Sequence, residues 1–286
     1  METVSLEKTK STIAPEPLIT AENYAFLQDQ IYKGSGIVLD ESKLYLIESR
    51  LSPILRRERL GTLNDLCALI RAVEGGAVKK QVVEAMTTNE TLFFRDASAF
   101  EALQKTVLPG LVEQRKSVSK LSLWSAAASS GQEAYSLAMM LLNLGLAGWQ
   151  IRILATDLND QILARARAGR YLQIEVNRGL PAKYLVKYFQ RSGLDWQIKD
   201  EVRKMVEFAP LDLRQSLRTM GPFDLVLCRN VLIYFDIETK KKILGEIRQT
   251  LFGKGLLLLG SAETTLNLDD AFTRKVIDQA TFYEAP

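Results

Sequence analysis

Histidine is absent from this chain of 286 residues. Without an imidazole, the chain cannot hold a Ser-His-Asp triad, a Cys-His pair, a histidine general base or a histidine-ligated metal. Cysteine is nearly absent too. The chain has only two, Cys67 and Cys228, and they lie far apart in the sequence. Their spacing fits neither a zinc site nor a disulfide framework, so we expect no metal cofactor and a reducing, cytoplasmic compartment.

Long apolar runs are missing as well. The longest stretches, among them Tyr135–Leu142 and Leu256–Leu259, fall far short of the roughly 20 apolar residues of a membrane span. Residues 1–10 are polar and charged, unlike a signal peptide. The chain has 37 basic and 34 acidic residues, and this near balance does not indicate a nucleic-acid partner. We therefore expect a cytoplasmic protein without nucleic-acid partners and without direct membrane insertion.

The first part of the chain has the pattern of helices. Residues 1–18 are polar and include two prolines, so we expect a flexible tail there. Residues 19–108 carry apolar side chains at spacings of three and four, separated by glycines, which predicts an N-terminal helical domain. Residues 109–119, with the charged stretch Glu113–Lys116, are the expected linker.

From residue 120 to residue 286, short apolar runs alternate with helical segments. This alternation predicts an α/β domain with a doubly wound, mostly parallel sheet. A stretch with glycine and proline at about 171–206 interrupts it and predicts a small inserted antiparallel β-subdomain, and Arg274–Ile277 with Thr281–Tyr283 predict a closing hairpin. The apolar runs expected to form the strands are Leu121–Trp124, Ile151–Ala155, Val206–Phe208, Phe223–Cys228 and Leu256–Leu259.

Two strand ends have the pattern of a nucleoside site. The first strand runs into the small residues Ser125–Gly131 and then a helix, which allows a ligand to approach the backbone. The G-x-G-x-x-G fingerprint is missing, which disfavours a nicotinamide-dependent dehydrogenase. Asp157 ends the second strand, where a carboxylate can accept hydrogen bonds from ribose hydroxyls. The alternatives are a plain tight turn and a helix cap made by Asp157 or Asn159.

A third strand end is also polar. The buried run Phe223–Cys228 is followed by Arg229 and Asn230, with Tyr234 close behind. Ligands in open α/β sheets bind at the carboxyl ends of the strands, which favours a site. The alternative is a turn with a packed tyrosine, and we expect Asp236 to cap the next helix.

A fourth polar stretch lies between the helical and α/β parts. Thr87–Arg95 combines hydroxyls, an amide and an arginine with the pair Phe93 and Phe94. Arg95 is able to form a bidentate pair with a carboxylate. Taken alone, the stretch is better explained as a solvated turn whose phenylalanines belong to the core.

Together the four stretches resemble a known family. Thr87–Arg95, Trp124–Glu133, Ala155–Asp157 and Phe223–Asp236 resemble, in order and spacing, the chemotaxis-receptor protein-glutamate methyltransferases, the CheR family. The similarity runs from about Ala21 to the C-terminus. It implies a class I S-adenosylmethionine-dependent methyltransferase with a Rossmann-like sheet and an all-α N-terminal domain. The reaction would convert glutamate side chains on the cytoplasmic helical domain of methyl-accepting receptors to methyl esters, leaving S-adenosylhomocysteine.

The resemblance also implies roles for particular residues. Arg95 and Tyr234 are the expected catalytic residues, and the cofactor is S-adenosylmethionine without a metal. Ala127 and Glu133 would contact its methionyl part, and Asp157 its ribose. The residues expected to bind the cofactor are Asn89, Thr91, Arg95, Ala127, Glu133, Asp157, Asp212, Leu213 (these two flanking the adenine), Cys228, Arg229 and Asn230.

Three departures from the family pattern stand out. Gln132-Glu133-Ala134 replaces the usual Glu-Glu-Pro, which retains the second acid. Asp212 replaces a common asparagine, so the adenine contact is expected to differ in detail. The loop at Ser192–Asp195 is shorter than in members that dock on a receptor's C-terminal peptide, which leaves tail-tethered recruitment in doubt.

The helical domain carries a basic stretch that the resemblance associates with receptor contact. Its arginines could meet acidic receptor helices and so recruit the enzyme to membrane receptors. The alternative is a solvated charged face, and Pro53 is placed to split the stretch into two helices. The residues expected to contact the receptor are Arg50, Arg56, Arg57 and Arg59.

Two other functions fit the same residues. The chain could be a non-catalytic module that binds S-adenosylmethionine or its demethylated product as a signal. It could also methylate carboxylates on a protein other than a receptor. Glutamate side chains, with a pKa of about 4.3, are ionised at neutral pH, so their methylation needs no general base and suits a chain without histidine.

Overall fold

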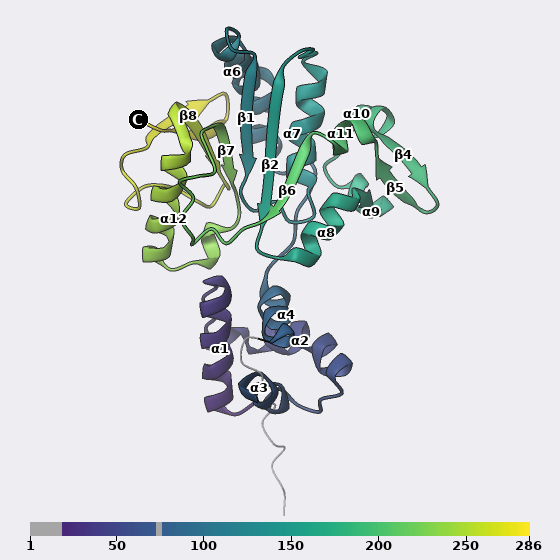
Figure 1. Cartoon of the computed structure of the whole chain (residues 1–286), viewed down its shortest axis with the longest axis vertical. Coiled ribbons are helices and arrows are strands. Elements are labelled where there is room, and N and C mark those ends of the chain that lie inside the picture. The colour runs from purple at the N-terminus through teal and green to yellow at the C-terminus, as the bar shows by residue number, and fades with distance from the viewer. Residues whose placement is uncertain (1–18, 73–75) are drawn as a thin grey trace, which may run out of the picture.

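The computed structural model describes residues 19–72 and 76–286, and the predicted tail at 1–18 lies outside the described residues. Figure 1 shows a small helical body below a larger body built on a sheet. No helix in the described part of the chain is both long enough and apolar enough to cross a membrane. The elements of the helical body are α1 (Ala21–Ser35), η1 (Glu41–Lys43), α2 (Leu44–Glu58), α3 (Leu63–Ala72) and α4 (Ala77–Met86).

The apolar faces of these helices meet in one core. Leu27 and Ile31 of α1, and Leu51 of α2, are fully buried in it. Pro53 lies inside α2 instead of starting a new helix, because buried side chains on both sides of it hold one continuous helix against the core. Arg50 and Arg57 therefore belong to the same helix.

The larger body contains a seven-stranded sheet in the order β6-β2-β1-β7-β8-β10-β9. Its first five strands in this order are parallel, and β10 runs antiparallel to both β8 and β9. The α/β prediction and the closing hairpin are confirmed. The strands are β1 (Lys120–Ser125), β2 (Gln150–Asp157), β6 (Val206–Pro210), β7 (Phe223–Cys228), β8 (Leu251–Leu259), β9 (Thr273–Ile277) and β10 (Ala280–Glu284).

The strand order reverses between β1 and β7, because the chain runs outward from β1 to β2 and β6, then returns to β7 and continues to β8. Loops that leave the carboxyl ends of β1 and β7 therefore diverge and leave an opening between them. Two apolar cores flank the sheet. The helices of this body are α5 (Ala97–Ala102), η2 (Leu103–Val107), α6 (Leu108–Arg115), α7 (Gln132–Asn143), α8 (Asp160–Ala168), η3 (Leu232–Tyr234) and α12 (Ile237–Thr250).

The expected boundary, with a helical domain up to 108 and a linker at 109–119, differs from the structure of residues 97–115. These residues form α5, η2 and α6, and Leu103, Leu108 and Leu111 are buried in the same core as Leu121 of β1. Buried Leu103, Val107 and Leu111 recur every four residues, and the polar residues 104–106 between the first two face solvent. This segment therefore belongs to the layers around the sheet, and the connection between the two bodies lies before it.

The predicted inserted antiparallel element is present. Its three strands have the order β3-β5-β4, and Figure 1 shows β4 and β5 projecting from the side of the larger body. Phe93 packs edge-on against Tyr171 and Phe189 of this insert, with ring centroids 5.0 and 5.6 Å apart. Its elements are β3 (Arg170–Tyr171), α9 (Gln173–Asn177), α10 (Ala182–Tyr188), β4 (Phe189–Ser192), β5 (Asp195–Ile198) and α11 (Asp200–Arg203).

Candidate functional site

A cleft opens where the carboxyl ends of β1, β2 and β7 face the chain segment that follows α4. It brings together most of the predicted site residues, from segments far apart in the sequence. Ser35 at the end of α1 and Ile37 just after it also line the cleft. The predicted residues that line the cleft are Asn89, Thr91, Arg95, Ala127, Glu133, Asp157, Asp212, Leu213, Arg229, Asn230 and Tyr234.

The loop between β1 and α7 forms the first wall. Gly131 has a φ of 92°, a left-handed conformation that lets the chain turn directly into α7. A side-chain carbon there would lie 3.2 Å from Tyr135, Ala166 and Phe208, so glycine also allows close packing. The preceding residues are small, and Ala127 and Ser129 reach the cleft surface.

Asp157 ends β2 and faces the cleft. Its Oδ2 accepts a hydrogen bond from the Ser129 backbone N–H at 2.9 Å, and its Oδ1 accepts one from the Asn159 N–H at 3.0 Å. Burial raises the pKa of Asp157 above the ordinary value of 3.8. The side chain that caps α8 is Asn159, which accepts from the Gln161 and Ile162 N–H groups. The cap is therefore made without the Asp157 carboxylate.

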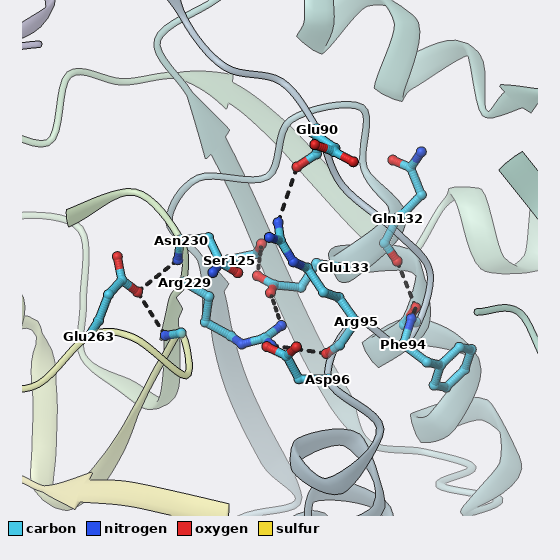
Figure 2. Close-up of polar contacts among 12 residues, drawn as sticks. Glu90, Phe94, Arg95, Asp96, Ser125, Gln132, Glu133, Arg229, Asn230 and Glu263 are labelled. Carbon is cyan, nitrogen blue, oxygen red and sulfur yellow. Dashed lines mark hydrogen bonds and ion pairs between the residues drawn. The ribbon is translucent and has the colours of Figure 1, made fainter. Parts of the chain in front are cut away.

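Arg229 is the centre of a buried charge network at the end of β7 (Figure 2). Its Nη1 donates to Glu133 Oε2 at 2.9 Å, and its Nη2 donates to Asp96 Oδ2 at 2.6 Å and to the Arg95 carbonyl at 2.9 Å. The other Glu133 oxygen accepts from Ser125 Oγ at 2.7 Å. The Arg229 side chain is 2% exposed, so this cluster is a fixed part of the cleft floor.

Asn230 and Tyr234 follow directly. Asn230 has a φ of 57°, and Tyr234 lies in the single turn η3. The Tyr234 carbonyl accepts from the Val38 N–H at 3.0 Å, which joins the two bodies of the molecule beside the cleft. Asp236 caps α12 through the Thr239 N–H at 2.8 Å, as predicted.

The segment Thr87–Arg95 forms the opposite wall. Ser129 Oγ donates to the Asn89 carbonyl at 2.7 Å, and Phe93 is buried in the core. Phe93 therefore packs inward while Asn89, Thr91 and Arg95 line the cleft. Arg95 is only half-buried, and its Nη1 donates to the Glu90 carbonyl at 3.2 Å.

Asp212 is paired with an arginine that the sequence did not suggest. Arg214 donates to both Asp212 oxygens at 2.6 to 3.1 Å. The same guanidinium donates to the Tyr32 and Lys33 carbonyls of α1, so it holds α1 against the larger body. The Asp212 carboxylate is therefore committed to this junction, while the buried Leu213 contributes apolar surface to the cleft.

Cys228 departs from the expectation that it closes the cleft. Its side chain is fully buried in the core that includes Trp124, Leu154 and Val226, and it is not part of the cleft surface. Successive side chains of a strand point to opposite faces, and Cys228 points to the face opposite Leu227. Burial raises the pKa of this thiol well above its ordinary value, so it is an unreactive core residue.

None of the four expected receptor-contact arginines lines the cleft. Arg50 donates to the Met86 and Thr87 carbonyls at 2.6 and 3.2 Å, so it ties α2 to the end of α4. Arg57 bonds to Glu58 at 2.9 Å. Arg56 and Arg59 are exposed, and within residues 19–72 and 76–286 their side chains have no ion-pair partner.

Three of the four carboxylates on the cleft surface are paired with arginines, Glu90 with Arg178, Glu133 with Arg229 and Asp212 with Arg214, whereas Asp157 has no ion-pair partner among the described residues. In the described part of the chain, carboxylates on the cleft surface outnumber guanidinium groups by four to two. A nucleoside with a positively charged sulfonium and ammonium group fits this donor set. The carboxylates belong to Glu90, Glu133, Asp157 and Asp212, and the guanidinium groups to Arg95 and Arg229.

Several residues of the site were not found from the sequence. Ser129 lies in the run of small residues already noted, so that run was the available signal. Asp96 holds Arg229, and Glu263 contacts the backbone after β7. Asp96 directly follows Arg95 at the end of the polar stretch already noted, whereas neither Glu263 nor Arg214 lies in a periodic or motif-like pattern.

Comparison with known proteins agrees with this geometry. The domain described as "CheR methyltransferase, all-alpha domain" matches residues 22–87, and "CheR methyltransferase, SAM binding domain" matches residues 89–280. The chain therefore belongs to the CheR methyltransferase family of S-adenosylmethionine-dependent enzymes, which confirms the resemblance seen in the sequence. The two matched ranges meet between residues 87 and 89, earlier than the linker expected at 109–119.

Curated relatives cover almost the whole chain. Chemotaxis protein methyltransferase 1 of Pseudomonas aeruginosa is 42% identical over 259 residues, which are 88% of this chain and 94% of the relative. Chemotaxis protein methyltransferase Cher2 of Pseudomonas putida is 39% identical over 271 residues, covering 92% and 98%. The chemotaxis protein methyltransferase of Vibrio parahaemolyticus is 40% identical over 253 residues, covering 86% and 89%.

Proposed function

We propose that this enzyme transfers the methyl group of S-adenosylmethionine to glutamate carboxylates of methyl-accepting chemotaxis receptors. One observation carries the proposal: Arg95 and Tyr234 share a cleft with Glu133 and Asp157. Two carboxylates suited to a cationic nucleoside thus lie beside an arginine and a phenol suited to an acceptor carboxylate. The relatives named as chemotaxis protein methyltransferases support the choice of acceptor.

The cofactor lies, in this proposal, along the ends of β1, β2 and β7. Asp157 accepts hydrogen bonds from the ribose hydroxyls, since the Ser129 and Asn159 N–H groups already fix its orientation. Glu133 faces the methionyl ammonium beside Ala127, and Leu213 packs against the adenine. Arg229 holds Glu133 from behind, so its guanidinium serves the cofactor indirectly.

When bound, the cofactor supplies a methyl group on a sulfonium that an ionised carboxylate can take without a base. Arg95 orients the acceptor carboxylate toward that methyl group, and its partial exposure lets it meet an incoming side chain. Its hold must stay moderate, because strong binding of the ground state would raise the barrier. Tyr234 bounds the same space and can donate its hydroxyl to the acceptor. Excluding water here helps, since charges are neutralised as the methyl group moves.

We assign the receptor-facing surface to the exposed end of α2. Arg56 and Arg59 are available for acidic receptor helices, with Arg57 beside them. Arg50 is excluded from this surface by its bonds to the Met86 and Thr87 carbonyls. Such contact would recruit a cytoplasmic enzyme to membrane receptors. Tethering through a receptor tail is not part of the proposal, because the turn between β4 and β5 spans only Ser192–Asp195.

The test is methyl transfer from labelled S-adenosylmethionine to a receptor cytoplasmic fragment, scored as methanol released by base. A carboxyl ester releases methanol in base, whereas N-methyl groups do not. We expect a signal that disappears when the receptor's acceptor glutamates are changed to alanine. Cofactor binding without transfer to any of several receptors would contradict the proposal and favour a binding module or a different protein substrate.

A further inference from the structure

The carboxylate of Glu263 is bound entirely by backbone N–H groups behind the cleft. Its Oε2 accepts from Asn230 and Gly260, both at 2.7 Å. Its Oε1 accepts from Val231 at 2.9 Å and from Leu232 at 2.7 Å. Figure 2 shows Glu263 reaching Asn230 from the side away from Arg95 and Glu133. One side chain from the loop after β8 thus fixes the backbone of the loop after β7.

The surroundings of this carboxylate are shaped to receive it. Gly260 has no room for a side chain, because a Cβ there would lie 2.7 Å from Glu263 Oε2 and 2.9 Å from the Asn230 backbone nitrogen. Asn230 adopts a left-handed φ of 57°, which turns its N–H toward the same oxygen. Both loops therefore take conformations that converge on one carboxylate.

The contacts also explain why an acid stands there. Val231 and Leu232 begin η3, and the first N–H groups of a helical turn have no partner within the turn. A carboxylate satisfies them with charge-assisted hydrogen bonds, which are stronger than neutral ones. Among the described residues, Glu263 has no ion-pair partner and does not line the cleft. Its charge therefore acts on the loop backbone.

We propose that Glu263 is a positioning residue that sets the path of the loop Asn230–Tyr234. The loop carries Asn230 and Val231 into the cofactor side of the cleft and Tyr234 into the acceptor side. Glu263 holds the first half of this loop, while the Val38 N–H holds the Tyr234 carbonyl at its end. The inference rests on the proposed function, since it assigns a role in the same reaction.

The test compares Glu263→Gln, which keeps the shape but loses the charge and one acceptor oxygen, with Glu263→Asp, which keeps the charge. Glu246→Gln is the matched control. Glu246 also accepts a backbone N–H, from Leu217 at 2.8 Å, but it lies outside the cleft lining. Three quantities are measured for each variant: amide exchange of the peptide 229–235, the dissociation constant of S-adenosylhomocysteine, and the single-turnover rate of methyl transfer with cofactor saturating. The KM for the receptor fragment is measured for Glu263→Gln in addition.

For Glu263→Gln we expect faster amide exchange in the peptide 229–235, because the carboxylate's charge and one of its two acceptor oxygens are lost. We expect the single-turnover rate to fall about tenfold or more and the dissociation constant to rise about fivefold, since small displacements of reacting groups cost large factors in rate. The KM for the receptor fragment should stay within about twofold, because α2 is untouched. Glu263→Asp should recover part of the rate, and Glu246→Gln should match the wild type in all three measurements.

The outcomes separate the two proposals. If the wild type transfers no methyl group to the receptor, the proposed function fails, and the change in exchange and in cofactor affinity still tests Glu263. If exchange rises in Glu263→Gln while affinity and single-turnover rate per folded molecule stay at wild-type values, Glu263 only stabilises the fold and the inference is overturned. An unchanged exchange rate would overturn it as well.

Discussion

Two arginines of the same cleft are held in opposite ways. Arg229, at the end of β7, is 2% exposed and bonds to Glu133, Asp96 and the Arg95 carbonyl. Arg95, on the segment that follows α4, is half-buried and has one weak bond to a carbonyl, at 3.2 Å. The floor of the cleft at the strand ends is thus fixed before any ligand arrives, whereas the opposite wall carries a cation free to engage one.

This difference indicates that the two sides of the cleft have different roles in the reaction. A buried arginine that is paired with two carboxylates supplies fixed geometry, and its removal leaves those partners without compensation. A half-exposed arginine contributes little to folding and can reorganise around an incoming carboxylate. We therefore assign the binding of a rigid cofactor to the floor and the orientation of a mobile acceptor to the wall. The following predictions test this division.

Replacing Arg95 should have the largest effect on the reaction. We expect Arg95→Ala to lower the rate of methyl transfer by about a thousandfold, because the acceptor carboxylate loses its orienting charge. The unfolding free energy should change by less than about 0.5 kcal/mol, since Arg95 makes one weak bond. Initial rates and urea denaturation check the two values. Near-normal turnover would remove Arg95 from the mechanism.

Replacing Arg229 should instead affect stability first. Arg229→Met keeps the length of the side chain but leaves Glu133 and Asp96 without their cation, at a cost of about 3 kcal/mol in unfolding free energy. Urea denaturation measures it, and Arg95→Met is the matched control. Adding Glu133→Gln should recover part of the loss. A variant as stable as wild type would contradict the fixed-floor interpretation.

Replacing Asp157 should weaken the binding of the cofactor. We expect Asp157→Asn to raise the dissociation constant of S-adenosylhomocysteine about thirtyfold, the equivalent of roughly 2 kcal/mol from lost charge-assisted hydrogen bonds. Titration calorimetry checks this change. Asn159→Ala, which removes the neighbouring helix cap, is a control for local unfolding.

The pH dependence of cofactor affinity tests the same contact between Asp157 and the ribose. Burial raises the pKa of Asp157, so the group takes up its proton at a higher pH than an ordinary aspartate with a pKa of 3.8. Cofactor affinity should be full at neutral pH and should decline as the pH falls through this raised value. In Asp157→Asn that decline should vanish. A wild-type affinity that stays flat down to pH 3.8 would argue against the ribose contact.

Reversing the charge of the exposed Arg56 and Arg59 should have the smallest effect on the reaction. For Arg56→Glu with Arg59→Glu we expect the KM for the receptor to rise about fivefold, with cofactor affinity unchanged, because rim charges act mainly on association. Added salt should reduce the difference. Lys242→Glu with Lys254→Glu makes the same change in net charge on other exposed residues. An equal rise in that control would show that only overall charge matters.

The sequence alone predicted the parts of the molecule that have a local pattern. The five parallel strands, the insert, the hairpin and the Asp236 cap follow from periodicity and turn chemistry. The polar residues that follow the strands could be predicted to lie close together, because parallel strands end at one edge of the sheet. The resemblance then supplied the segment Thr87–Arg95, whose residues favoured a plain turn by themselves.

The rest depended on contacts that leave no local signal. Glu263 and Arg214 bind backbone groups distant in the sequence, which no spacing rule anticipates. The face of the sheet on which the Cys228 side chain lies could not be predicted. A central parallel strand is apolar on both faces, so the alternation of side chains cannot distinguish one face from the other. The linker expected at 109–119 was misplaced because its charged stretch resembles a connector, whereas residues up to 115 belong to α6.

The ion-pair network of Arg229, Glu133 and Asp96 also bears on how this protein can diverge. Replacing Arg229 leaves the buried Glu133 carboxylate without its cation, and replacing Glu133 leaves the buried guanidinium with only the partly exposed Asp96 as a partner. The loss in stability would expose either change to selection before a second change arises. Descendants should therefore exchange Arg229 and Glu133 in concert or keep both. Arg95, with no such partners, is constrained by chemistry alone.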